Sequence, residues 1–205
     1  MKRRPVQPDD GEPTDWPGSA EVSAYLERQL AGRRLAPRTC LTYGRSLKAF
    51  ALWMKAAGGW DGDWSKLAAR HLRDFVIERQ ATHHRRSVHN QVSALRAFLA
   101  DLRERGLIST TPAAGLVLPR LPKSLPKFLT EAQTDALLAV AEEPAKADPT
   151  AAARDLAALE LLYGGGLRVS ELCGLDGGDL DLTSGLVRLM GKGSKERVVP
   201  VGDEA

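Results

Sequence analysis

Three charged residues in the second half of the sequence have the types and spacing to bind and activate a phosphate ester. Arg168 and Glu171 stand three residues apart on a short predicted helix, Leu167–Leu175, and so share one face of it. Lys192 stands between two glycines at a predicted hairpin tip, where the backbone can approach a partner closely. A guanidinium grips phosphate oxygens, and an ammonium can protonate a leaving oxygen. We therefore expect Arg168 and Lys192 to converge on one phosphate, with Glu171 supporting Arg168.

Simpler interpretations exist for the same residues. A lone arginine on a helix is usually a solvated surface residue, and a lysine at a hairpin tip commonly prevents strand edges from pairing. A nucleotide-binding phosphate loop is excluded, because five residues instead of four separate Gly185 from Gly191. Gly193 also follows the lysine where that loop requires Ser or Thr.

The elements that must position these residues are predicted from the period of the apolar side chains. The run Asp155–Tyr163 has helical spacing, and the three glycines 164–166 end that helix. From Asp179 the period is two, which predicts three short strands, 179–182, 186–190 and 196–201, with turns at 183–185 and 191–194. On the helix Leu167–Leu175, the side chains expected to face a core are Val169, Leu172 and Cys173. On the strands, the side chains expected to form an apolar face are Val187, Leu189 and Val198. This face is expected to be uncovered, which would leave the C-terminal domain marginally stable.

The two segments LLYGGGLRVSELCGL (161–175) and GLVRLMGKGSKERVVPVG (185–202) follow each other in a long, ordered pattern. The pattern resembles the catalytic domain of the tyrosine recombinases of the phage-integrase family, in particular the Xer type. The resemblance implies that Arg168 contacts the scissile phosphate and that Glu171 supports it. It implies that Lys192 is the general acid for the leaving 5′ hydroxyl.

The resemblance also implies later motifs: a second arginine set after a histidine, another histidine or tryptophan, and a nucleophilic tyrosine. The sequence stops at Ala205 before any of them, and we expect Tyr25, Tyr43 and Tyr163 to be core or DNA-facing aromatics. We therefore expect a C-terminally truncated recombinase that is inactive alone. The alternatives are a non-catalytic DNA-binding protein derived from a recombinase and a helical interaction protein that binds no nucleic acid.

The first half is predicted to be an all-α bundle. Its four helices are expected to begin at Ser19 as an N-cap, near Pro37, at Ala68 and at Arg86. The apolar residues of the third are Leu72, Phe75, Val76 and Ile77. The fourth carries one broad apolar stripe, made of Val88, Val92, Leu95, Phe98, Leu99 and Leu102.

Two of these helices begin in basic sequence without acids, which indicates a nucleic-acid surface. Cations neutralise phosphates, and Arg, Asn and Gln can read base edges, although such residues also line ordinary solvated faces. This half resembles the family's SAM-like core-binding domain, so double-stranded DNA is the implied partner. The candidate DNA contacts are Arg38, Thr39, Tyr43, Arg45 and Lys48 in the second helix and Arg85, Arg86, Ser87, His89, Asn90 and Gln91 at the start of the fourth.

The predicted fold class is mainly α, with a four-helix domain followed by the first part of an α+β catalytic domain that carries a three-stranded sheet. The expected domains are a disordered tail (1–17), a helical DNA-binding domain (18–108), a proline-rich basic linker (109–129) and a partial catalytic domain (130–205). Within the last domain, a helix capped by Thr130 is expected to run to about Glu143, and residues 141–153 are expected to form a loop.

Composition excludes several classes of protein. The chain has 205 residues, 43% of them apolar, with a net charge of +3, and it contains no apolar run of membrane-spanning length. The N-terminus is not a signal peptide, and the unpatterned Cys40 and Cys173 fit a cytoplasmic protein without a disulfide framework or a zinc site. The adjacent His83 and His84 point to different sides, so no metal is expected. The resemblance implies no cofactor and a tetramer of recombinase subunits on two DNA sites.

Overall fold

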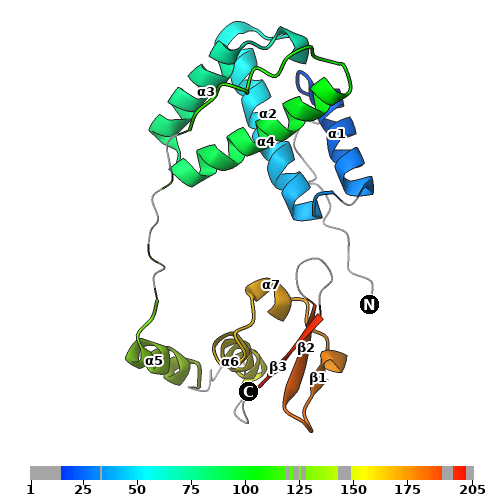
Figure 1. Ribbon diagram of the computed structural model, residues 1–205. Helices are drawn as coiled ribbons and strands as arrows, with labels where there is room; N and C mark the ends of the chain where they lie inside the picture. Colours follow the sequence, from blue (N-terminus) through cyan, green and yellow to red (C-terminus); the bar gives the residue numbers. More distant parts are fainter. Residues whose placement is uncertain are drawn as a thin grey trace. The chain divides into compact units, whose positions relative to one another are not determined.

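The computed structural model describes residues 15–32, 34–118, 121, 125, 128–142, 149–190 and 196–201. The chain divides into two compact units, Met1–Lys123 and Ser124–Ala205 (Figure 1). Lys192 and the predicted turn at 191–194 lie outside the described residues, as do most positions of the predicted linker between 119 and 127.

The first unit is helical, as predicted. Ser19 is the first helical residue of α1 and not its cap, because Gly18 precedes it in a left-handed conformation at the N-cap. Proline occupies the first position of α2, where its missing N–H has no helical partner to lose. The helical elements are α1 (Ser19–Ala31), α2 (Pro37–Gly58), the 3-10 turn η1 (Trp64–Lys66), α3 (Ala69–Thr82) and α4 (Arg85–Glu104).

The apolar stripe predicted for α4 is confirmed, since each of its six side chains is at most 1% exposed. It lies at the centre of an aromatic core. The centroid of the Phe98 ring lies 4.7 Å from that of Trp64 and 5.3 Å from that of Tyr25, and both ring pairs are edge-to-face. Ile77, an apolar residue of α3, lies outside the core. Its side chain is 61% exposed, because the buried Phe75 and Val76 already define the inward face of α3.

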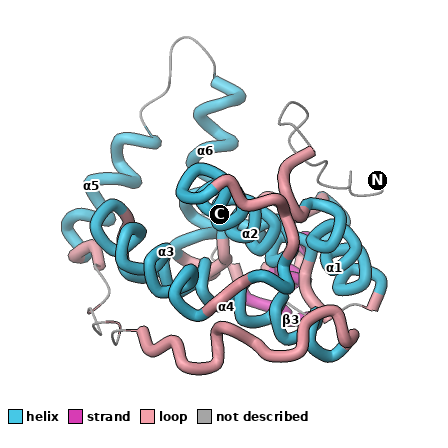
Figure 2. The backbone as a smooth tube through the Cα atoms, turned by 90° about the horizontal axis from the view of Figure 1, so that it is seen from above, coloured by secondary structure: helices cyan, strands magenta, loops and turns pink. Residues whose placement is uncertain are grey.

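Chain segments on both sides of the helices complete this core. Trp16 packs against it, and the indole N–H of Trp64 donates to the carbonyl of Gly18 at 3.1 Å. After α4, the segment 105–118 returns along the helices (Figure 2), where Ile108 and Ala113 are buried and Arg96 donates to the carbonyl of Leu116. The helices of the first unit therefore pack around one core.

The second unit combines three helices with a small sheet. The helix predicted to run to about Glu143 is present, but the loop predicted over 141–153 is wrong at its C-terminal end. α5 continues to Glu142, and α6 begins at Pro149, because proline suits a first helical turn and the alanines after it are strong helix formers. The described elements are α5 (Glu131–Glu142), α6 (Pro149–Tyr163), α7 (Val169–Leu172), the 3-10 turn η2 (Gly177–Asp179), β1 (Leu180–Asp181), β2 (Leu186–Met190) and β3 (Glu196–Pro200).

The three strands form an antiparallel sheet in the order β1-β2-β3, and its register decides which side chains are buried. Val187 pairs with Val199 and Leu189 with Arg197, whereas Val198 pairs with Arg188 on the other face. Val198 is 54% exposed, so its assignment to the apolar face is wrong, and Val199 takes that place.

The expectation that the apolar face of the sheet is uncovered is also wrong for β2. Val187 and Leu189 are each 1% exposed, because Leu161 from α6 and Leu167 from the following turn pack on them. This cluster is small, and it connects the sheet directly to the segment that carries Arg168. In the part of the chain that the structure describes, no helix is long and apolar enough to cross a membrane.

Candidate phosphate-binding site

A tight glycine turn delivers Arg168 to the surface of the second unit. Gly166 has a φ of 59°, in the left-handed region that glycine adopts without strain. Gly165 lies so close to its neighbours that a Cβ atom there would stand 2.7 Å from Leu167 Cδ1 and 2.9 Å from the Leu161 carbonyl oxygen. The buried Leu167 anchors the turn in the core, and Arg168 follows as the N-cap of α7.

The predicted pairing of Arg168 with Glu171 is present. Glu171 Oε2 accepts the backbone N–H of Arg168 at 2.8 Å, and Oε1 accepts the guanidinium Nη1 at 2.8 Å. The side chain of Glu171 is 4% exposed and that of Arg168 is 71% exposed. A buried carboxylate therefore holds one edge of a solvent-facing guanidinium, whose Nε and Nη2 atoms make no hydrogen bond with the described residues.

The predicted length of the helix after the turn is wrong. α7 is a single turn, Val169–Leu172, and of the side chains assigned to the core Val169 is 66% exposed and Cys173 is exposed, while Leu172 is half-buried. Glu171 is buried instead, because the turn directs it toward the two guanidiniums that surround it.

The second of these guanidiniums belongs to Arg197, which was not among the site residues predicted from the sequence. Its Nη2 atom donates to Glu171 Oε2 at 2.9 Å and to the carbonyl of Gly166 at 3.3 Å. The signal in the sequence was the alternation of β3, since Arg197 has the same parity as Val199 and so lies on the inward face. An arginine at an inward strand position indicates a buried acidic partner.

These contacts change the titration of Glu171. Its pKa is lowered to about 2 from the usual 4.5, first by the hydrogen bond from the backbone N–H of Arg168 and then by the guanidiniums of Arg197 and Arg168. Burial acts in the opposite direction. Glu171 is therefore ionised at neutral pH, and the three side chains carry two positive charges and one negative charge. The net positive charge suits a phosphate diester.

The candidate DNA contacts of the first unit lie between Arg38 and Lys48 on α2 and at the start of α4. Arg38 and Arg45 on α2 are exposed. Tyr43 is half-buried and packs against the core with part of its side chain. α4 begins with exposed Arg85 and Arg86, has no acid in its first turn, and is capped by His84, whose Nδ1 accepts the N–H of Arg86 at 3.3 Å. The positive end of the helix dipole adds to these charges.

The other candidates differ in how open they are. Ser87 and Asn90 are exposed, while Thr39, Lys48, His89 and Gln91 are half-buried. The Oε1 atom of Gln91 is buried and has no hydrogen-bond partner in the described part of the chain.

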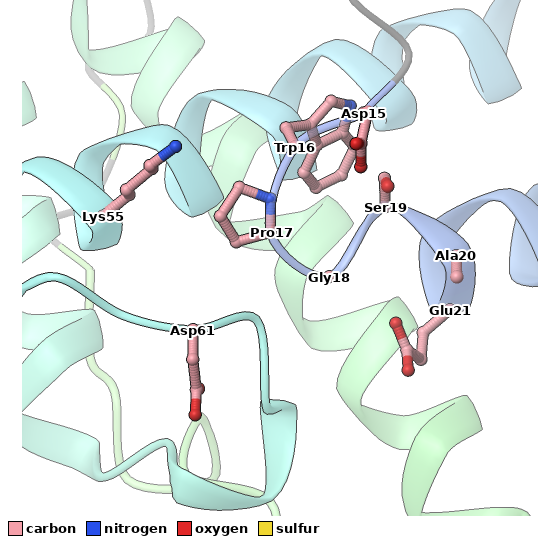
Figure 3. Close-up of a pocket in the computed structure, with 9 residues that line it drawn as sticks. All are labelled: Asp15, Trp16, Pro17, Gly18, Ser19, Ala20, Glu21, Lys55 and Asp61. Carbon is pink, nitrogen blue, oxygen red and sulfur yellow. The ribbon is translucent and has the colours of Figure 1, made fainter.

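A hollow of about 420 Å³ lies between the segment 15–21 and the side chains of Lys55 and Asp61 (Figure 3). The charged side chains around it point in different directions, and Asp61 turns away from Trp16 to bond Lys66. The hollow therefore presents no convergent set of polar groups. Within the described ranges, no group of three His, Cys, Asp or Glu side chains could hold a metal ion.

Comparison with known proteins places both units in one group. Residues 22–106 match the phage integrase N-terminal SAM-like domain, and residues 127–205 match the phage integrase family. Tyrosine recombinase XerC of Xanthomonas axonopodis pv. citri is 38% identical over 199 residues, which cover 91% of this chain and 62% of that protein. Tyrosine recombinase XerD of Xanthomonas campestris pv. campestris is 42% identical over 185 residues, covering 90% and 55%. The chain thus spans 55–62% of the length of these curated relatives.

Solved structures show the same fold. A lambda integrase dimer bound to a COC′ core site matches with a TM-score of 0.66 and 19% identity, over 88% of this chain and 61% of that one. A lambda integrase tetramer bound to a Holliday junction matches with a TM-score of 0.67 and 19% identity, over 88% and 49%.

Proposed function

Because the chain belongs to the phage integrase family of tyrosine recombinases, we propose that it supplies the DNA-binding unit and the phosphate-binding part of the active site of a Xer-type site-specific recombinase. The observation that carries this proposal is the exposed Arg168 guanidinium held by a buried carboxylate. A surface arginine that only contributed to solubility would not need a buried ionised partner.

The proposed reaction is the exchange of one phosphate ester for another. A tyrosine hydroxyl that residues 1–205 do not supply attacks the scissile phosphorus and releases its proton to solvent, so that a 3′-phosphotyrosine forms and the bond to the 5′ oxygen breaks. Arg168 binds the non-bridging oxygens, on which negative charge develops, and Glu171 fixes its position. Lys192, outside the described residues, protonates the leaving 5′ oxygen. The reverse attack by a 5′ hydroxyl rejoins the strand, and no metal or nucleotide is needed.

The first unit is proposed to bind duplex DNA through residues 38–48 of α2 and the start of α4. The predicted contacts are the eleven residues named from the sequence, with the exposed Arg38, Arg45, Arg85 and Arg86 as phosphate contacts. Asn90 and Gln91 are the side chains suited to base edges, and Asn90 is the more exposed of the two.

The biological setting is proposed by analogy. A lambda integrase of the same fold forms a tetramer on a Holliday junction, so the proposed partners are other recombinase subunits in a tetramer on two DNA sites. The roles to test are the resolution of chromosome dimers before cell division and the integration of mobile DNA, and action on chromosomal DNA would place the protein in the cytoplasm.

The first experiment measures the binding of residues 1–205 to a short DNA duplex as a function of salt concentration. About five or six phosphate contacts predict a log–log slope near −5. A slope near zero would eliminate every DNA-binding interpretation of the chain.

The second experiment uses a longer polypeptide in which residues 1–205 continue through a nucleophilic tyrosine, and it scores the covalent protein–DNA complex. Arg168→Ala should abolish the covalent complex while changing duplex affinity little, since one phosphate contact among several is lost. Binding without any covalent complex in the unsubstituted polypeptide would favour the alternative of a non-catalytic DNA-binding protein.

A further inference from the structure

Arg197 occupies an unusual place for a charged side chain. It lies on the inward face of β3, opposite the fully buried Leu189 and two residues before Val199, which packs in the core of the second unit. Its side chain is 42% exposed, so its stem passes the core and its guanidinium emerges beside α7. The sheet and the turn that carries Arg168 therefore meet at this residue.

The hydrogen bonds at Glu171 divide between two guanidiniums. Oε2 accepts from the backbone N–H of Arg168 and from Nη2 of Arg197, and Oε1 is left to Nη1 of Arg168. Arg197 also binds the carbonyl of Gly166, two residues before Arg168. It thus holds both the carboxylate that orients Arg168 and the backbone that leads into it.

We propose that Arg197 is a positioning residue for Arg168, fixing the plane of the Glu171 carboxylate so that the Arg168 guanidinium keeps its free edge toward the phosphate. This inference rests on the proposed function of Arg168. Without Arg197, Oε2 of Glu171 would keep only the backbone N–H of Arg168, and the side-chain partner left to the carboxylate would be the largely exposed guanidinium of Arg168. The Glu171 side chain would then rotate, and Arg168 would move with it.

The chain offers a matched control for this residue. Arg188 lies on β2 of the same sheet but on its outer face, where it pairs with Glu196 at 3.2 Å. Arg188→Gln removes the same charge from the same sheet without touching Glu171. Arg197→Gln removes both hydrogen bonds at the turn, whereas in Arg197→Lys a single ammonium replaces the guanidinium fork and retains the charge.

The structural test follows the Glu171 carboxyl by NMR titration in residues 1–205. Arg197→Gln should raise the pKa of Glu171, Arg197→Lys should raise it less, and Arg188→Gln should leave it unchanged. An unchanged pKa in Arg197→Gln, with the fold retained, would overturn the inference. This readout needs no DNA, so it stands even if the proposed function fails.

The functional test measures the rate of covalent-complex formation in the longer polypeptide. Arg197→Gln should lower this rate about 10- to 100-fold, because a misplacement of about 1 Å costs up to that much. Duplex affinity should change less than about 2-fold, because several other phosphate contacts remain. Arg197→Lys should recover part of the rate, and Arg188→Gln should match the unsubstituted protein.

The outcomes separate the two proposals. If Arg168→Ala abolishes cleavage but Arg197→Gln and Arg197→Lys both cleave at the full rate, the positioning role is wrong and the proposed function stands. If Arg168→Ala cleaves normally, the proposed function of this site is wrong. Should Arg197→Gln fail to fold, the rate and the Glu171 pKa of Arg197→Lys decide the inference.

Discussion

Replacing Gly165 by alanine is a direct test of how the glycine turn positions Arg168. The added Cβ would stand 2.7 Å from Leu167 Cδ1 and 2.9 Å from the Leu161 carbonyl oxygen. Carbon atoms prefer about 3.5–4.0 Å, so Leu167 must move by about 1 Å. Leu167 is 6% exposed and packs in the core with Leu161 and Leu189, so this movement strains the core.

We expect Gly165→Ala to lower the stability of the second unit by about 1–3 kcal/mol, as overpacking of a filled core does. Since the Leu161 oxygen is a backbone atom, the glycine turn itself must also shift, and a shift of about 1 Å at Arg168 should lower the cleavage rate of the longer polypeptide up to about 100-fold. Gly178→Ala is the control, because a Cβ at Gly178 meets nothing within 4 Å. Its effect should stay within about 0.5 kcal/mol.

The assay must report the second unit alone. The four tryptophans, Trp16, Trp53, Trp60 and Trp64, all belong to the first unit, so fluorescence monitors that unit and serves as an internal control. Hydrogen exchange of the β2 amides reports the second unit, and a loss of about 1–3 kcal/mol corresponds to protection lower by about 5- to 150-fold. Equal protection in Gly165→Ala and Gly178→Ala would refute the packing argument.

Three other features of the described residues can be tested, each with its own measurement. The folded-state pKa of Glu171, about 2, lies below the usual 4.5, so its stabilisation is present above pH 4.5 and lost as the pH falls toward 2. The protection of the β3 amides, expressed relative to their intrinsic exchange rate at each pH, should fall in that window. A Glu171→Gln variant with the same pH profile would contradict this. Phe98→Ala should destabilise the first unit by about 3–5 kcal/mol in urea unfolding followed by tryptophan fluorescence, because Phe98 is fully buried against Trp64; a loss below about 1 kcal/mol would show that the core collapses around the gap. Arg86→Gln should reduce the salt slope of DNA binding by about 1, whereas Arg103→Gln, about 26 Å away along α4, should not; equal slopes would remove the start of α4 from the DNA surface.

Local sequence determined the elements whose signals are repeated within a few residues. The apolar residues from Val88 to Leu102 recur at helical spacing and therefore lie on one face of the helix. The buried face of α4 could be predicted from this spacing. Arg168 and Glu171 are three residues apart, a spacing at which side chains meet on a helical turn without help from elsewhere. The strands of the hairpin followed from the change to a period of two.

Tertiary structure decided what depended on register and on contacts between distant segments. Val198 and Val199 have equal propensity, and only the pairing of β3 with β2 turned Val199 inward. Ile77 is apolar but lies outside the narrow face that α3 buries. Arg197 and Glu171 are 26 residues apart in the sequence, and they meet because the hairpin folds back onto the turn after α6. The local residue pattern of one segment cannot specify such a contact. The contact depends on the free energy of packing of the two segments together.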